Sequence, residues 1–198
     1  GTSIKMTKEH FFPTIIYVKD LPNPEKLNLY LEKHIIEWSK RDKGLKRTNV
    51  NGWQSRDDMN QRKEYVPLIK ELFQMQHEII QEEHLAVERP KLANMWANIN
   101  PTGGYNKEHI HPNASFSGVY YVKAPPNSGR LVVRDPRPGV QQSWIPTKSG
   151  KLPRELWRET HYDPTAGRII MFPSWLWHQV EPNESNDIRM AVAFNFAL

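Results

Sequence analysis

The sequence predicts a mainly β fold, with a barrel or jelly roll in the C-terminal half and supporting helices in the N-terminal half. From residue 91 onward, short apolar or alternating runs are separated by clusters of Gly and Pro, as in all-β sandwiches and barrels. Before residue 91, two runs have apolar residues at helical spacing. We expect one domain over residues 1–198, with 1–90 as a helical and loop support and 91–198 as the jelly-roll core.

The two helical runs differ in how clearly they begin. Asn23 is expected as the N-cap and Pro24 as the first helical residue of a helix that reaches about Trp38. The second run, residues 66–84, places its apolar side chains on one stripe. Both are expected to pack against a sheet. The polar stretch between them predicts a long loop with one strand near Trp53.

The C-terminal half contains six runs that predict strands. They are short, and turn clusters such as residues 125–129 separate them. The six runs cover residues 92–100, 114–122, 130–133, 142–145, 169–172 and 189–196. Residues 134–158 are rich in proline and basic residues, which predicts a long loop, either a lid over the site or an ordinary solvent loop.

Composition narrows the chemistry. The chain has no cysteine, which excludes disulfides, zinc–thiolate centres, iron–sulfur clusters and a thiol nucleophile. The net charge of +5 is dispersed along the chain, so nucleic-acid binding is not expected. No apolar run approaches the roughly 20 residues that cross a bilayer, and the first residues contain no signal-peptide core. We therefore expect no membrane association and a cytoplasmic location, in a bacterium or, for a phage protein, in its host.

Three histidines and one arginine form the candidate site. His109 and His111 are separated by one residue, and such side chains point to the same face of an extended strand. His178 follows 67 residues after His111, and Arg189 follows 11 residues after His178, far enough for later strands to bring both to the same place. Neutral imidazole binds Fe(II), Zn(II), Cu(II) or Ni(II), so the histidines alone do not select the metal. An arginine inside a barrel needs an anion, and guanidinium pairs with carboxylate through two hydrogen bonds.

Ordinary structural roles also explain these residues. His109 and His111 could form hydrogen bonds around a turn, and Arg189 could pair with Glu181 or Asp187 at the end of its strand. On the sequence alone, both explanations stay open.

Taken together, the chain resembles the Fe(II)- and 2-oxoglutarate-dependent oxygenases, in the prolyl-hydroxylase-like branch of the double-stranded β-helix enzymes. The motifs that carry the resemblance are Tyr105-x-x-x-His109-x-His111, Ser117-Gly118-Val119-Tyr120-Tyr121, Ser128-Gly129-Arg130-Leu131, His178-Gln179-Val180-Glu181-Pro182 and Arg189-Met190-Ala191. With Asp135-Pro136-Arg137 and residues 172–178, the chain is most similar to a group of uncharacterised oxygenases of bacteria and phages. Residues 51–55 also resemble that group, which extends the resemblance over the whole chain.

The resemblance implies a double-stranded β-helix (jelly-roll, cupin-like) core and hydroxylation that consumes Fe(II)-bound 2-oxoglutarate and O2 and releases succinate and CO2. The residues it implies are the metal ligands His109, His111 and His178, the carboxylate-binding Arg189 and Tyr121, and Asn195 as a further candidate on the strand face of Arg189.

One departure from the family pattern concerns the metal. The family normally has Asp or Glu where this sequence has His111. Three outcomes stay open: His111 completes a three-histidine site, Asp135 substitutes as the third ligand, or the iron keeps an extra water. The first is favoured because the spacing to His109 already directs His111 inward. Asp135 could instead pair with Arg137. Ala191 stands where the family often has Ser or Thr, so Tyr121 would matter more.

Two other functions stay open. One is a three-histidine dioxygenase of cupin type, which binds its organic substrate directly on iron and uses no 2-oxoglutarate. The other is a non-catalytic jelly roll that binds a metal or a carboxylate. The expected partners are O2 and an unidentified substrate, either a small molecule or a protein side chain. The tryptophans within residues 172–178 would also permit a homodimer.

Overall fold

The structure is a computed structural model that describes residues 3–140, 142, 146, 148 and 152–198. Among these residues, the α-helices are α1 (Glu25–Arg41) and α2 (Val66–Glu82), and three short 3-10 helices cover Met59–Gln61, Lys63–Tyr65 and Arg154–Leu156. Its strands are β1 (Tyr17–Asp20), β2 (Asn49–Val50), β3 (Trp53–Gln54), β4 (Lys91–Asn100), β5 (Tyr105–His109), β6 (Phe116–Lys123), β7 (Leu131–Arg134), β8 (Glu159–Tyr162), β9 (Arg168–Pro173), β10 (His178–Val180) and β11 (Arg189–Ala197).

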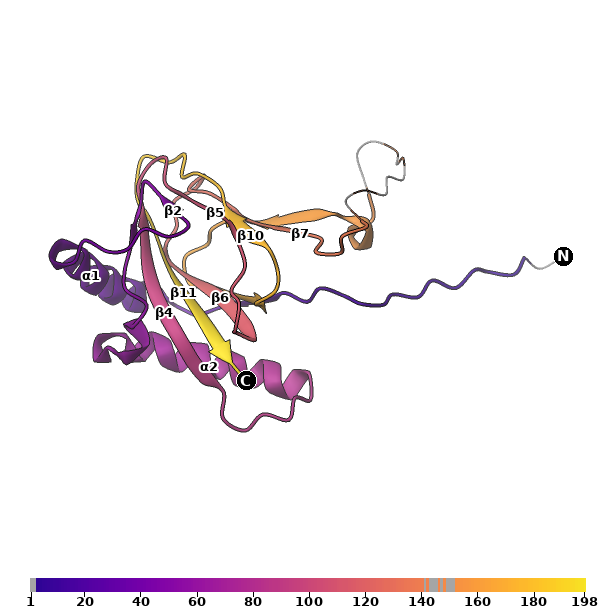
Figure 1. The fold of residues 1–198 in the computed structure, drawn as a ribbon, viewed down its shortest axis with the longest axis horizontal. Coiled ribbons are helices and arrows are strands. Elements are labelled where there is room, and N and C mark those ends of the chain that lie inside the picture. Colours follow the sequence, from indigo (N-terminus) through magenta and orange to yellow (C-terminus); the bar gives the residue numbers. More distant parts are fainter. Residues whose placement is uncertain (1–2, 141, 143–145, 147, 149–151) are drawn as a thin grey trace.

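The strands form two antiparallel sheets, which make up the double-stranded β-helix expected from the sequence (Figure 1). The larger sheet has the order β1-β9-β6-β11-β4-β3, and the smaller has the order β2-β5-β10-β7-β8. The two helices pack on the outer face of the larger sheet through the main apolar core. The other face of this sheet borders the space between the sheets, where the candidate site lies.

Strand β11 shows how the sequence separates these two faces. Met190, Val192, Phe194 and Phe196 are buried in the core beneath the helices. The alternating set, which includes Arg189 and Asn195, lines the cavity between the sheets. Successive side chains of a strand point to opposite faces, so one segment supplies both core and site.

Both helices are confirmed, but the start of the first one differs from the prediction. α1 begins at Glu25, and Pro24 occupies the N-cap position without a side-chain hydrogen bond. Asn23 has a φ of 48°, in the left-handed region. The prediction of Asn23 as the N-cap is therefore wrong, because this residue makes the turn that leads into the helix.

The N-terminal part of the chain contributes strands to both sheets. β1 pairs with β9 and β3 pairs with β4 in the larger sheet, while β2 pairs with β5 in the smaller one. β3 is the strand predicted near Trp53. These pairings support a single domain over residues 1–198, which stays a prediction. The predicted strand 142–145 lies, apart from Gln142, outside the described residues.

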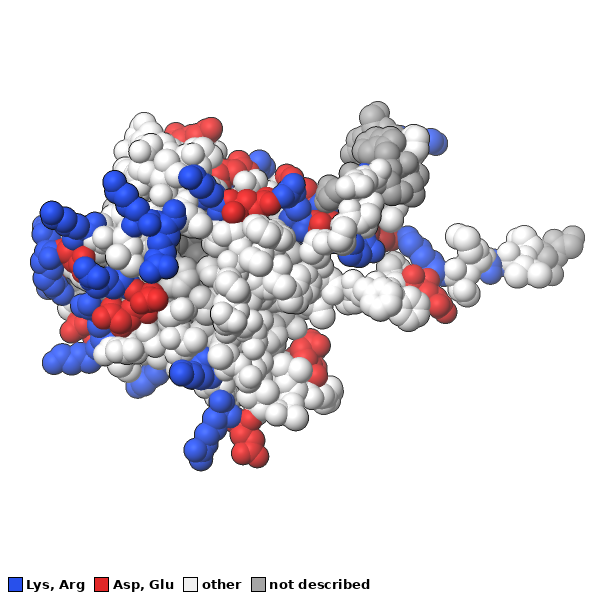
Figure 2. Space-filling model, viewed as in Figure 1, with Lys and Arg blue, Asp and Glu red and all other residues white. Residues whose placement is uncertain are grey.

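Residues 3–16 run as an extended segment away from the sheets (Figure 1). On the face drawn in Figure 2, basic and acidic side chains are mixed around the α1 end, and the centre is mostly uncharged. Within the described part of the chain, neither helix combines the length and the apolar character that a membrane crossing requires.

Candidate metal centre and carboxylate site

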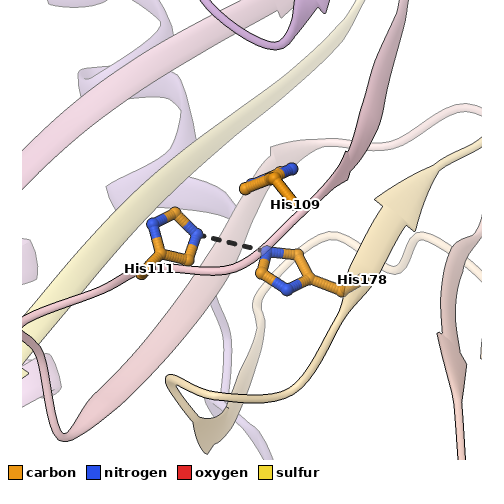
Figure 3. Close-up of side chains that lie close together, drawn as sticks. All are labelled: His109, His111 and His178. Carbon is orange, nitrogen blue, oxygen red and sulfur yellow. Dashed lines mark hydrogen bonds between the residues drawn. The ribbon is translucent and has the colours of Figure 1, made fainter. Parts of the chain in front are cut away.

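The three predicted histidines come together between the sheets. His109 ends β5 and His178 begins β10, and the two residues pair directly in the antiparallel register. His111 lies two residues beyond the end of β5, and its backbone N–H donates to the carbonyl of Ser174 at 3.1 Å. One ligand atom from each ring lies within 4.8 Å of the others (Figure 3). His111 is therefore positioned by its backbone hydrogen bond to Ser174, because the strand that carries His109 has already ended.

Backbone carbonyls orient two of the three rings. Nδ1 of His109 lies 2.6 Å from the carbonyl oxygen of Lys107, and Nδ1 of His178 lies 2.9 Å from that of Leu176. A carbonyl oxygen only accepts hydrogen bonds, so both Nδ1 atoms carry the proton and both Nε2 atoms keep a free lone pair. Metal-binding histidines usually have this arrangement, in which the outer nitrogen donates to a carbonyl or carboxylate.

The inner nitrogens have the spacing of two ligands of one ion. Nε2 of His111 lies 3.2 Å from Nε2 of His178 (Figure 3). Two nitrogens that each bind an ion at about 2.1 Å, at close to a right angle, are separated by about 3 Å. The donor set and its spacing therefore fit a divalent transition metal.

Burial keeps the histidines neutral. It lowers the pKa of His178 to about 3 and that of His111 to about 4, and it also lowers the pKa of His109. The charge of His109 adds to the lowering at the other two rings. Near pH 7 all three imidazoles are in the uncharged form that binds metals.

Arg189 is buried beside this cluster, with 4% of its surface exposed. Its Nη1 donates to the carbonyl oxygen of Ser128 and, at 3.4 Å, to that of Glu181. Burial lowers the pKa of Arg189 below its usual value, yet a guanidinium keeps its proton in proteins. Arg189 lines the same cavity as the three histidines.

The two carboxylates that could have neutralised Arg189 bind other residues. Glu181 pairs with Arg130 at 2.9 Å, and Asp187 pairs with Lys123 at 3.1 Å. Among the residues that the structure describes, no carboxylate forms an ion pair with Arg189. The alternative explanation of Arg189 as the partner of Glu181 or Asp187 is therefore wrong, and a buried cation without a protein anion is suited to an anionic ligand.

Tyr121 lies on β6 beside Arg189. It pairs in register with Ala191 of β11 and lines the same cavity. Burial raises the pKa of its phenol to about 12, and the charge of Arg189 partly opposes this effect. At neutral pH the phenol keeps its proton and can donate a hydrogen bond to an acceptor in the cavity.

The backbone at Gly129 approaches the guanidinium of Arg189 closely, a contact that the sequence did not reveal. A Cβ at this position would lie closer than 3.0 Å both to Nη1 of Arg189 and to the carbonyl oxygen of Glu181, and the residue has a φ of +107°. Only glycine allows this backbone conformation and this approach together. The Ser-Gly-Arg motif was visible in the sequence, but its contact with Arg189 depends on the fold.

The alternative metal ligand lies apart from the histidine cluster. The close group of ligand atoms within the described residues consists of His109, His111 and His178, without Asp135. The carboxylate of Asp135 accepts hydrogen bonds from the Arg137 side chain at 2.7 and 3.1 Å. This is the ion pair that the sequence suggested.

Asn195 occupies the opposite end of the cavity from Arg189. Its Oδ1 accepts from the hydroxyl of Ser117 at 2.6 Å, and its Nδ2 donates to Oδ1 of Asn94 at 2.7 Å. Six residues of extended strand span about 20 Å, so one small diacid does not reach both Asn195 and Arg189. This location does not fit a role of Asn195 in binding the carboxylate held by Arg189.

A jelly roll that gathers three neutral imidazoles beside a buried guanidinium defines a class of metal-dependent protein with an anionic co-ligand. The sequence model of the family described as "Putative 2OG-Fe(II) oxygenase" matches residues 94–195, and the chain belongs to this family. The protein is therefore an oxygenase whose cofactors are Fe(II) and 2-oxoglutarate and whose co-substrate is O2. None of the curated proteins compared with the chain matches it.

Solved structures of prolyl hydroxylases share the fold. The prolyl-4-hydroxylase of Pseudomonas putida has a TM-score of 0.64 and 16% identity, over 93% of this chain and 92% of that one. The viral collagen prolyl hydroxylase of Paramecium bursaria Chlorella virus-1, in complex with 2-oxoglutarate, has a TM-score of 0.57 and 14% identity, over 92% and 96%. The prolyl hydroxylase of Trichoplax adhaerens has a TM-score of 0.61 and 12% identity, over 92% and 83%. At these identities the likeness shows the fold alone.

Proposed function

We propose that His109, His111 and His178 hold Fe(II), and that Arg189 and Tyr121 hold the far carboxylate of 2-oxoglutarate, in an oxygenase that hydroxylates a C–H bond of a small molecule or a protein side chain. The observation that carries this proposal is the buried, carboxylate-free guanidinium of Arg189 in the cavity that the histidine rings also line. A structural arginine would have a protein anion as its partner.

When bound, Fe(II) and 2-oxoglutarate supply O2 activation, in which the 2-oxo acid loses CO2 and becomes succinate while the substrate is hydroxylated. The protein side chains orient these two groups. The carbonyls of Lys107 and Leu176 fix the outer nitrogens of His109 and His178, so both lone pairs point inward.

Arg189 and Tyr121 orient the dicarboxylate. The guanidinium offers parallel N–H donors to the two carboxylate oxygens, and the phenol offers one O–H. The apolar side chains of Leu131, Phe172 and Val180 line the same cavity and reduce the water around this charged pair. Such a dry environment strengthens the pairing.

The replacement of the usual carboxylate ligand by His111 changes the charge balance. Three imidazoles leave both charges of a divalent ion uncompensated, and Arg189 adds a third positive charge. A dianionic co-ligand balances most of this charge. We infer that the three-histidine set makes the metal site more dependent on 2-oxoglutarate, and that Asp135 takes no part in it.

Titration calorimetry tests the proposal with protein purified without a nickel column. The Fe(II)-loaded protein, kept anaerobic, is expected to bind 2-oxoglutarate, and the Arg189→Ala variant is expected to bind it at least tenfold more weakly with Fe(II) affinity unchanged. In air, the wild type should then form succinate. A wild type that binds Fe(II) but not 2-oxoglutarate would contradict the proposal and favour the cupin-type alternative.

A further inference from the structure

The cavity has two chemically different sides. Strand β11 lies between β6 and β4, and its small residues Ala191 and Ala193 form part of the cavity lining (Figure 1). On the β6 side lie Tyr121 and apolar side chains, while Arg189 lies on β11 itself and pairs in register with Asn100 of β4. On the side of β3, β4 and β5, five amide side chains line the cavity, and these are Gln54, Asn94, Asn98, Asn100 and Asn106.

The amide side contains an unused acceptor. Asn98 is 8% exposed, and its buried Oδ1 has no hydrogen-bond donor among the described residues. Asn100 donates to Asn106 only at 3.4 Å, a long hydrogen bond. Buried polar atoms are normally satisfied, so an open amide oxygen in a cavity is a place for a ligand's O–H or N–H group. The amides recognise polar groups but supply no charge.

Two exposed side chains of opposite charge line the cavity, one beside each sheet. The carbonyl of Thr48, next to Arg47, accepts from the Lys107 N–H of β5, and the carbonyl of Asp57 accepts from the Met95 N–H of β4. Arg47 and Asp57 are exposed, and both line the cavity. Neither side chain has an ion pair within the part of the chain that the structure describes. The cavity lining therefore includes one exposed cation beside β5 of the smaller sheet and one exposed anion beside β4 of the larger sheet.

We propose that the substrate is a free α-amino acid with a polar side chain, bound as its zwitterion. Its carboxylate pairs with Arg47, its ammonium pairs with Asp57, and its side chain extends along the amides toward the histidines. A residue inside a polypeptide lacks both of these charges, and so does a neutral sugar. The cavity of about 340 Å³ also favours a small ligand beside the co-substrate.

This inference rests on the proposed function and uses the same reaction. A C–H bond of the amino-acid side chain breaks, and a C–OH bond forms with one oxygen atom of O2. The other oxygen atom enters succinate as 2-oxoglutarate loses CO2. The C–H bond and the oxidative decarboxylation supply two electrons each, which balances the four-electron reduction of O2.

The first test compares free and blocked amino acids. The wild type is incubated with Fe(II), 2-oxoglutarate, O2 and each of the twenty L-amino acids, or with its N-acetyl N-methylamide. Succinate formation and the mass of one added oxygen are measured. At least one free polar amino acid is expected to be hydroxylated at more than tenfold the rate of its blocked form. Equal or faster reaction of the blocked forms, or no response to any amino acid while 2-oxoglutarate still binds, would overturn the inference. Failure of the wild type to bind 2-oxoglutarate would instead overturn the proposed function.

Matched variants test the two charges with the amino acid that reacts. Asp57→Asn and Arg47→Gln are each expected to raise the KM for that amino acid at least tenfold and to leave the KM for 2-oxoglutarate unchanged. The control variants Asp58→Asn and Arg56→Gln change neighbouring charges that pair with Arg62 and Asp42, respectively. They are expected to leave both KM values unchanged. An unchanged KM in both test variants would show that Arg47 and Asp57 do not bind the zwitterion.

Discussion

The contact between Gly129 and Arg189 allows the carboxylate site to be weakened without removing any side chain. In the Gly129→Ala variant, the new Cβ would come closer than 3.0 Å to the guanidinium and to the Glu181 carbonyl. The guanidinium ends a flexible side chain and will move, and the clash with the backbone carbonyl also requires the chain around residue 129 to shift. The proposed pair of hydrogen bonds from the Arg189 guanidinium to the far carboxylate of 2-oxoglutarate then loses at least one member.

The expected size of the effect follows from that loss. A hydrogen bond to a charged group contributes about 1.5–3 kcal/mol, and each 1.4 kcal/mol or so is tenfold in affinity. The dissociation constant of 2-oxoglutarate should therefore rise about 10- to 100-fold in Gly129→Ala. Titration calorimetry with the Fe(II)-loaded protein measures it. 2-Oxobutyrate, which lacks the far carboxylate, should bind equally to both proteins.

Gly103→Ala is the matched control. Gly103 has a φ of +88°, and a Cβ there would meet nothing within 4 Å. Both variants therefore carry backbone strain of about 1–3 kcal/mol, but only Gly129→Ala displaces Arg189. Thermal unfolding should show a loss of stability in both variants, and a larger loss in Gly129→Ala, because its Cβ also meets the Glu181 carbonyl. Wild-type affinity for 2-oxoglutarate in folded Gly129→Ala would refute the reasoning.

Four further predictions test individual side chains. His178→Ala should abolish Fe(II) binding and Asp135→Asn should leave it unchanged in metal titrations; weaker binding by Asp135→Asn would restore Asp135 as a ligand. Tyr121→Phe should raise the dissociation constant of 2-oxoglutarate about tenfold through one lost hydrogen bond, with Fe(II) affinity as the control. Asn195→Ala should leave that constant unchanged, because Asn195 lies about 20 Å along the strand from the guanidinium; a tenfold change would contradict this placement. The metal-free protein should lose stability as the pH falls from about 6.5 toward 4, because the pKa values of His178 and His111, about 3 and 4, lie below that of an unfolded histidine. Chemical denaturation at pH 7.5 and 5 measures this loss, and His178→Gln should reduce it; an equal loss in the variant would contradict the assignment.

The parts of the fold that the sequence predicted are those with a long and regular pattern. α2, β4 and β11 each carry enough alternating or helical apolar residues to determine their conformation. β5 and β10, which carry two of the three histidines, are not among the six strand runs, although the spacing argument for His109 and His111 assumed an extended segment. β5 is polar and β10 has three residues, and their strand conformation depends on pairing with each other and with their neighbours. No local pattern reveals such pairing.

In the candidate site, too, the sequence revealed residues that stand out locally but not the contacts between segments far apart in the chain. His109 and His111 were found because they are close in sequence, and Arg189 because an arginine stands out in an apolar strand. The approach of Gly129 to Arg189 joins segments that are distant in sequence. The open oxygen of Asn98 was equally hidden, because an asparagine in an alternating strand is ordinary until its surroundings are known.

Strand β11 sets the spacing between the proposed site of 2-oxoglutarate and the polar end of the cavity. Its inward residues run from Arg189 through Ala191 and Ala193 to Asn195, so the charged anchor and the polar end stand apart on one straight segment. The two alanines between them line the cavity with methyl groups only, which occupy little of its volume. Because the outward residues of the same strand are fixed in the helix-covered core, this spacing is rigid. The proposed anchor for the co-substrate, Arg189, is thereby positioned by the same packing that stabilises the fold, and on the inference above the amides of neighbouring β4 would contact the substrate.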